Sequence, residues 1–111
     1  MAVTPKRLIA SQLLTGSAAT YYTATNCKAR IDSFTLTNTD TSAVTVTVYI
    51  IASGGTASAD ETIISAKSLA AGECYTCPEL VGGWLESGEF VQAFAGTASK
   101  VVIRSSGIES T

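Results

Sequence analysis

The chain of 111 residues carries a formal net charge of −2, contains no histidine and has only 14% charged residues, while 29 residues are serine or threonine. This length predicts a single domain with a buried core, and the scattered Lys and Arg residues exclude the basic footprint of a nucleic-acid-binding protein. Because threonine fits the half-buried surface of a pleated sheet, the composition favours an all-β fold.

The lack of a recognisable targeting signal and the number of cysteines both favour folding in a reducing compartment. No apolar run approaches the ~18–20 residues that a membrane helix needs. No apolar segment with a small-residue cleavage site follows Lys6 and Arg7, so a secretory signal is not expected. The cysteines Cys27, Cys74 and Cys77 are odd in number and do not form a secreted disulfide framework. We therefore expect folding in a cytoplasm.

The N-terminal part predicts a short arm followed by two strands. Residues 1–5 form the arm, and the strands cover residues 6–14 and 17–25. Leu, Ala and Gln in residues 6–14 also suit a helix, but the early stop at Thr15–Gly16 and the β pattern downstream favour a strand. The second strand contains the adjacent residues Tyr21 and Tyr22. Adjacent side chains in a strand point to opposite faces of the sheet, so one of the two rings is expected to face outward.

The next strand, residues 27–38, changes phase along its length. Its apolar positions are odd-numbered up to Ile31 and even-numbered from Phe34 onward. This change predicts a bulge or bend near Asp32–Ser33. A turn is expected over residues 38–42, where Asn and Asp side chains can bond their own backbone.

The clearest alternation of the chain covers residues 43–52. One face of this strand is apolar throughout and is predicted to be core: Val44, Val46, Val48 and Ile50. Tyr49 and Ile51 lie on the opposite face, which becomes apolar at its end. An apolar outer face is typical of contact with another chain, and packing within this chain is the alternative.

The C-terminal half predicts a loop, four strands and a wide corner. The loop covers residues 53–60. The strands cover residues 62–69, 73–77, 89–95 and 100–106, and a polar tail covers residues 107–111. Pro78 ends one strand because it lacks a backbone donor. Gly82–Gly83 disfavours a helix in the corner over residues 79–88, so an irregular turn pinned by Trp84 is expected.

The strand pattern predicts the architecture. About eight short strands recur at the spacing of about 8–12 residues that is typical of a sandwich or barrel. An eight-stranded antiparallel jelly-roll-like sandwich is therefore expected, with two sheets that face one core. A smaller β-barrel is the alternative.

Few residues are suited to catalysis or to metal binding. The absence of histidine removes the usual general base and the commonest nitrogen ligand. The carboxylates fall mostly in turns and at strand ends, so we expect no enzyme activity and no cofactor. Cys74 and Cys77 have the spacing of half a zinc site, but a second pair is missing. Buried packing of both thiols is the preferred interpretation, with no metal bound.

Aromatic and apolar residues supply the candidates for contact with a partner. Trp84 is interpreted either as a core plug at the end of the sandwich or as an aromatic anchor for a partner. The candidate protein-interface residues are Tyr21, Tyr22, Tyr49, Ile51 and Trp84.

Two long segments of the chain resemble a known family. The segments are TNTDTSAVTVTVYIIASGGTAS (residues 37–58) and SLAAGECYTCPELVGGWLESGEFVQAF (residues 68–94), and the AAGE turn and the LESGEF step are their most pattern-like parts. Both resemble small virion proteins of tailed bacteriophages, in particular the capsid decoration, or staple, proteins of epsilon15-like phages. The resemblance spans about residues 6–107.

The resemblance implies a function that is not enzymatic. It implies a jelly-roll-like protein, made in the cytoplasm of the bacterial host, that binds the outside of an assembled icosahedral capsid. There it clamps neighbouring copies of the major capsid protein as a homodimer on two-fold positions. Two alternatives are a carbohydrate-binding module that uses Trp84, Tyr21 or Tyr22 as a stacking platform, and a head–tail connector or tail component.

Overall fold

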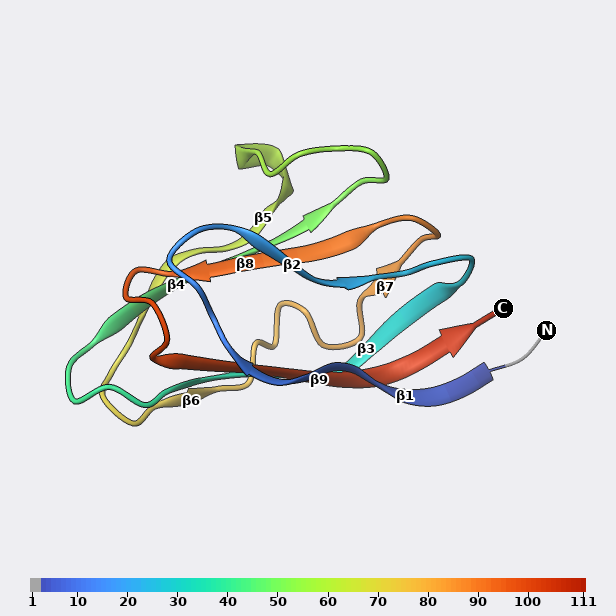
Figure 1. Cartoon of the computed structure of the whole chain (residues 1–111). Coiled ribbons are helices and arrows are strands. Elements are labelled where there is room, and N and C mark those ends of the chain that lie inside the picture. The colour runs from blue at the N-terminus through green and yellow to red at the C-terminus, as the bar shows by residue number, and fades with distance from the viewer. Residues whose placement is uncertain (1–2) are drawn as a thin grey trace.

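A computed structural model describes residues 3–111, which form two antiparallel sheets packed face to face (Figure 1). We name each sheet after its first strand. The β1 sheet contains β1 (Val3–Leu13), β9 (Val101–Ser110), β3 (Lys28–Asn38) and β6 (Cys74–Tyr75) in that order, and β7 (Trp84–Leu85) also pairs with β3. The β2 sheet contains, in order, β2 (Ala19–Thr23), β8 (Phe90–Ala95), β4 (Val44–Ile51) and β5 (Thr62–Leu69).

The order of the strands is that of a jelly roll. If β7 is set aside, successive strands alternate between the two sheets except at the β4–β5 connection, which stays within the β2 sheet. This arrangement confirms the predicted all-β sandwich. All eight predicted strands are present, and the ninth, β7, lies in the corner that was expected to be irregular. Among residues 3–111, no helix is long and apolar enough to cross a membrane.

The two ends of the described chain pair with each other, which corrects the predicted arm and tail. Val3 lies opposite Ser110 and Pro5 lies opposite Ile108, so β1 and β9 continue to the ends of the sandwich. Pro5 is tolerated because β1 is an edge strand. Gly107 of β9 allows the close approach of β3, since a Cβ at Gly107 would lie 1.9 Å from the carbonyl oxygen of Arg30. The first two residues of the predicted arm lie outside the described residues.

The predicted bulge in β3 is confirmed. Ile31 pairs with Gly107 and Ser33 pairs with Ser106, so Asp32 is an extra residue relative to β9. The bulge returns the apolar side chains to the same face, and Ile31 and Phe34 are both buried in the core.

The predicted core face of β4 and the turn before it are also confirmed. The valines of that face are buried between the sheets, and Ile50 is partly buried against the same core. In the turn, Asp40 N–H donates to Oδ1 of Asn38, and Thr41 N–H donates to the Asp40 carboxylate. These are the local side-chain bonds that favour Asn and Asp in turns.

Candidate functional site: an apolar cleft at one edge of the sandwich

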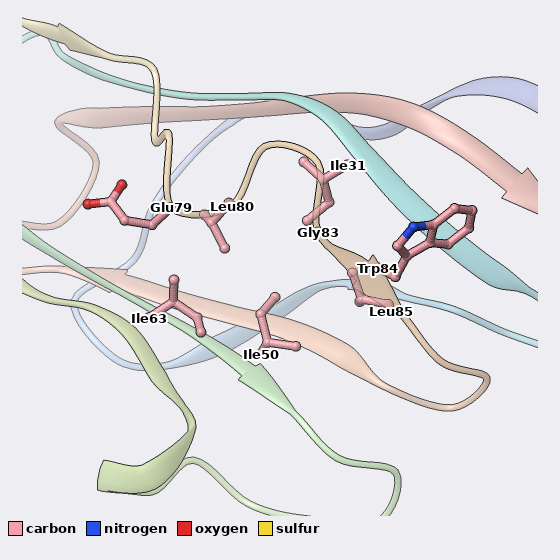
Figure 2. Close-up of a pocket in the computed structure, with 8 residues that line it drawn as sticks. All are labelled: Ile31, Ile50, Ile63, Glu79, Leu80, Gly83, Trp84 and Leu85. Carbon is pink, nitrogen blue, oxygen red and sulfur yellow. The ribbon is translucent and has the colours of Figure 1, made fainter.

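A cleft of about 190 Å³ opens between the two sheets at the β5 edge of the sandwich. Its lining residues are Ile31, Ile50, Ile63, Glu79, Leu80, Gly83, Trp84 and Leu85. Figure 2 shows Ile50 and Ile63 on one side of the cleft and Leu80 and Leu85 on the other. The walls are therefore aliphatic, and they come from β4 and β5 on one side and from β3, β7 and residues 78–83 on the other. We call residues 78–83 the corner segment.

The corner segment closes the sheet edge by a series of turns. Cys77, just before it, has φ +49°, and Leu80 N–H donates to the Cys77 carbonyl at 2.9 Å. Gly82, at φ +86°, donates to the Ile31 carbonyl at 2.6 Å, and Ile31 N–H donates to the Gly83 carbonyl at 2.9 Å. These bonds attach the segment to β3 and direct the Leu80 side chain inward, where it is buried.

Of the two interpretations of Trp84, the core plug is wrong. Trp84 and Leu85 are neighbours in β7 and point to opposite faces. Leu85 takes the interior position and is buried, whereas Trp84 remains 50% exposed. Figure 2 shows the indole directed away from the centre of the cleft. The guanidinium carbon of Arg30 lies 5.8 Å from the centre of this ring, within the range of a cation–π contact.

The opposite end of the cleft is acidic. The Tyr75 hydroxyl donates to the Glu79 carboxylate. The hydroxyl oxygen lies 2.6 Å from Oε1 and 2.5 Å from Oε2 of that carboxylate. This bond lowers the pKa of Glu79 below its ordinary value, so the carboxylate is ionised at neutral pH. The same bond raises the pKa of Tyr75 to about 12. The ammonium group of Lys67 lies 4.5 Å from the centre of the Tyr75 ring.

The two cysteines of the C-x-x-C pair have different surroundings. Cys77 is buried, and burial raises the pKa of its thiol to about 12. Cys27 is buried as well, as the packing interpretation expected. Cys74 is exposed, so the prediction that it is a buried residue is wrong. The described part of the chain, residues 3–111, contains no group of three or more Cys, Asp or Glu residues that could hold a metal ion.

Ile51 lies on the outer face of β4, as predicted, but its role as a candidate contact for a partner needs a correction. Ile51 has 0% exposure, although it lies outside the core cluster between the sheets. The loop after β4 covers it: Ala52 N–H donates to Glu61 at 2.8 Å, and a Cβ at Gly55 would lie 3.2 Å from Cγ2 of Ile51. Figure 1 shows this loop on the outer side of the β2 sheet. Ile51 is therefore not available to a partner.

The prediction that one of the adjacent tyrosines faces outward is also wrong. Tyr22 is buried in the core cluster, and Tyr21 is partly buried against the same cluster. A register shift between Thr20 and Tyr22 interrupts the alternation of β2. The hydroxyl groups are engaged as well, because Tyr21 accepts a bond from Thr15 N–H and Tyr22 donates to Glu109.

Tyr49 stays on the outer face of β4, as predicted. It is partly exposed, and its ring stacks with that of Phe94 at a distance of 6.3 Å between centres. Tyr49, Trp84 and the partly buried Tyr21 are thus the predicted contact residues that retain exposed surface.

Sequence reasoning did not find most of the cleft. The residue pattern places Ile63 only in a strand and Leu80 and Glu79 only in a corner. The available signal was the pair Ile63–Ile64, which interrupts the alternation of a strand that is half-buried.

No protein-family model, no curated protein and no solved structure matches this chain.

Proposed function

We propose that this protein is a non-enzymatic structural protein of a bacteriophage virion that binds the outside of the assembled capsid and stabilises the shell. The major capsid protein is its partner, and a homodimer is its working form. The sequence resemblance to capsid decoration proteins supports this proposal, and the jelly-roll sandwich is the fold that this resemblance implies.

The observation that best supports a protein-binding role is the gathering of exposed apolar side chains around the cleft. The exposed large apolar side chains of the described chain are Val3, Leu13, Ile63, Val81 and Trp84. Ile63 and Trp84 line the cleft, and Val81 belongs to the corner segment that forms one of its walls. An apolar patch with a polar surround is typical of a protein interaction site.

Stabilisation of the shell would follow from mass action. A ligand that binds only the assembled lattice stabilises it by RT ln(1 + [L]/Kd) for each site. Because a capsid repeats the same site many times, a modest affinity at each position is sufficient to hold the shell together.

The number of copies in each particle tests the proposal. Virions of the phage that encodes the protein are purified and their proteins are counted by quantitative mass spectrometry. We expect a fixed ratio to the major capsid protein, with on the order of hundreds of copies in a closed symmetric shell. About a dozen copies, as in a ring with heterologous contacts, would instead support the connector alternative.

The exposed indole of Trp84 favours one second candidate, a carbohydrate-binding module. Its ring has free surface for stacking on a sugar, although Arg30 lies over the ring. Tyr21 and Tyr22 do not extend this platform, because both pack against the core. A glycan array would support this candidate if it gave selective binding that Trp84→Ala removes and Trp84→Phe retains.

A further inference from the structure

On the basis of the proposed function, we infer that the cleft receives one apolar side chain of the partner protein, next to a Lys or Arg side chain that pairs with Glu79. The occupant is thus a segment of another protein with an apolar residue and a basic residue side by side. The cleft supplies one binding feature for each of them.

The size and lining of the cleft suit a single apolar side chain. Its volume is about 190 Å³, and an apolar cavity of about 150 Å³ is known to hold benzene. Ile50 and Ile63 on one side and Leu80 and Leu85 on the other can contact both faces of the inserted group (Figure 2). As far as residues 3–111 are concerned, neither wall offers a cation or a metal site to a polar ligand.

The negative charge of Glu79 at the end of the cleft favours a basic residue beside the inserted apolar residue of the partner. Within residues 3–111, no cation lies within 4.0 Å of Glu79, since the ion pairs join Lys6–Glu109, Lys28–Glu86 and Arg30–Asp32. Lys67 sits over the Tyr75 ring, where it makes no ion pair with Glu79 and contributes less than the Tyr75 bond to the lowered pKa of that carboxylate. The single Tyr75 hydroxyl lies within hydrogen-bond distance of both Glu79 oxygens, so its bond holds the carboxylate in place at the mouth of the cleft. A positive group on the partner is the complement of this end.

The irregular edge strand β5, beside the cleft, argues against another mode of binding, in which a strand of the partner would pair with the edge of the β2 sheet. β5 has two register shifts relative to β4, and Ala66 within it has φ +45°. Irregular edges of this kind prevent pairing with another strand. Insertion of a side chain into the cleft needs no regular edge, so it is the mode that this surface permits.

Two short peptides and NMR spectroscopy test the inference on the whole chain. The probes are acetyl-Phe-Arg-amide and acetyl-Phe-Gln-amide, which differ only in the charge of the second side chain. We expect both to shift the signals of Ile63, Leu80 and the Trp84 indole. The arginine peptide should bind about 1.4- to 5-fold more tightly, the range expected for an exposed ion pair.

A pair of variants then assigns the preference to Glu79. Glu79→Gln should remove the preference for the arginine peptide and leave the affinity for the glutamine peptide unchanged. Glu86→Gln is the matched control, because Glu86 is exposed and pairs with Lys28 outside the lining of the cleft. This control should keep the preference of the unaltered protein.

Several results would overturn the inference. One is the absence of shifts at the cleft with either peptide, and another is a preference that survives Glu79→Gln. Cleft signals that shift with protein concentration alone, together with a dimer in sedimentation, would assign the cleft to a second copy of this chain. A high copy number in virions with an unresponsive cleft would leave the decoration function in place and reject only the inference. If the protein binds the peptides in the cleft but is absent from virions, the decoration function is rejected and the assignment of the cleft is kept.

Discussion

At the scale of single residues, Asn38 shows how a polar side chain holds the two sheets together. It is fully buried at the end of β3, and its amide nitrogen lies 3.0 Å from both the Ser42 and the Leu69 carbonyl oxygens and 3.2 Å from that of Ala70. Because Leu69 ends β5 of the opposite sheet, this amide joins the sheets at the end of the sandwich.

Replacement of Asn38 should therefore be costly. Asn38→Ala leaves buried carbonyl groups without a donor, so we expect it to lower the free energy of unfolding by about 1–3 kcal/mol. Urea unfolding followed by Trp84 fluorescence measures this change. Thr41→Ala, an exposed substitution in the same turn, should change it by less than about 0.5 kcal/mol. Equal effects of the two substitutions would contradict the role of the amide.

The cysteines give a second prediction at this scale. A thiol reagent should label Cys74 alone in the folded protein at neutral pH, because Cys77 and Cys27 are buried. The raised pKa of Cys77, about 12, further lowers its fraction of reactive thiolate. Mass spectrometry after proteolysis identifies the labelled residues, and all three should react in denaturant. Rapid labelling of Cys77 in the native state would show that the corner segment opens easily.

At the scale of elements, the short strand β7 places a core residue, Leu85, next to a surface residue, Trp84. Leu85→Ala removes a buried side chain and should lower the free energy of unfolding by about 2–5 kcal/mol. Trp84→Ala removes a half-exposed side chain and should lower it by no more than about 1 kcal/mol, the value of an exposed cation–π contact. Chemical unfolding of both variants, followed by circular dichroism, measures the difference. A larger loss for Trp84→Ala than for Leu85→Ala would mean that the two faces of β7 are wrongly assigned.

The same scale shows what the pattern of residues could predict. The alternation of β4 and the phase change of β3 are local, so they predicted a core face and a bulge correctly. In β2 and β7 the local pattern was insufficient. A bulge turned Tyr21 and Tyr22 towards the core together, and pairing with β3 decided which residue of Trp84–Leu85 faces inward.

At the scale of the whole molecule, one cluster links both sheets and both ends of the described chain. Tyr22 of β2 donates a hydrogen bond to Glu109 of β9, and Lys6 of β1 pairs with the same carboxylate at 3.2 Å. The bond from Tyr22 is the main cause of the lowered pKa of Glu109, and Lys6 contributes. Burial and then Glu109 raise the pKa of Tyr22.

This cluster predicts a loss of stability in acid. Since the folded-state pKa of Glu109 is lowered, its contribution is complete above the unfolded-state value of about 4.3 and is lost as the pH falls towards the folded-state value. Tyr22→Phe should reduce stability at pH 7 by about 1.5–3 kcal/mol, the range for a hydrogen bond to a charged group. Its unfolding free energy should also fall less steeply below about pH 4. Thermal and urea unfolding between pH 7 and pH 3 measure both effects, and an unchanged acid slope would contradict the assignment.

The sequence by itself determined the all-β class, the positions of eight strands, the turn at Asn38 and the bulge in β3. Each of these depends on a period of two residues or on turn chemistry, which act over a few neighbouring positions. Only the tertiary structure decided that the two ends of the described chain pair, that a loop covers Ile51 and that an apolar cleft with Glu79 at its end lies beside β5. These features depend on contacts between segments far apart in the chain, and local periodicity carries no information about which segments meet.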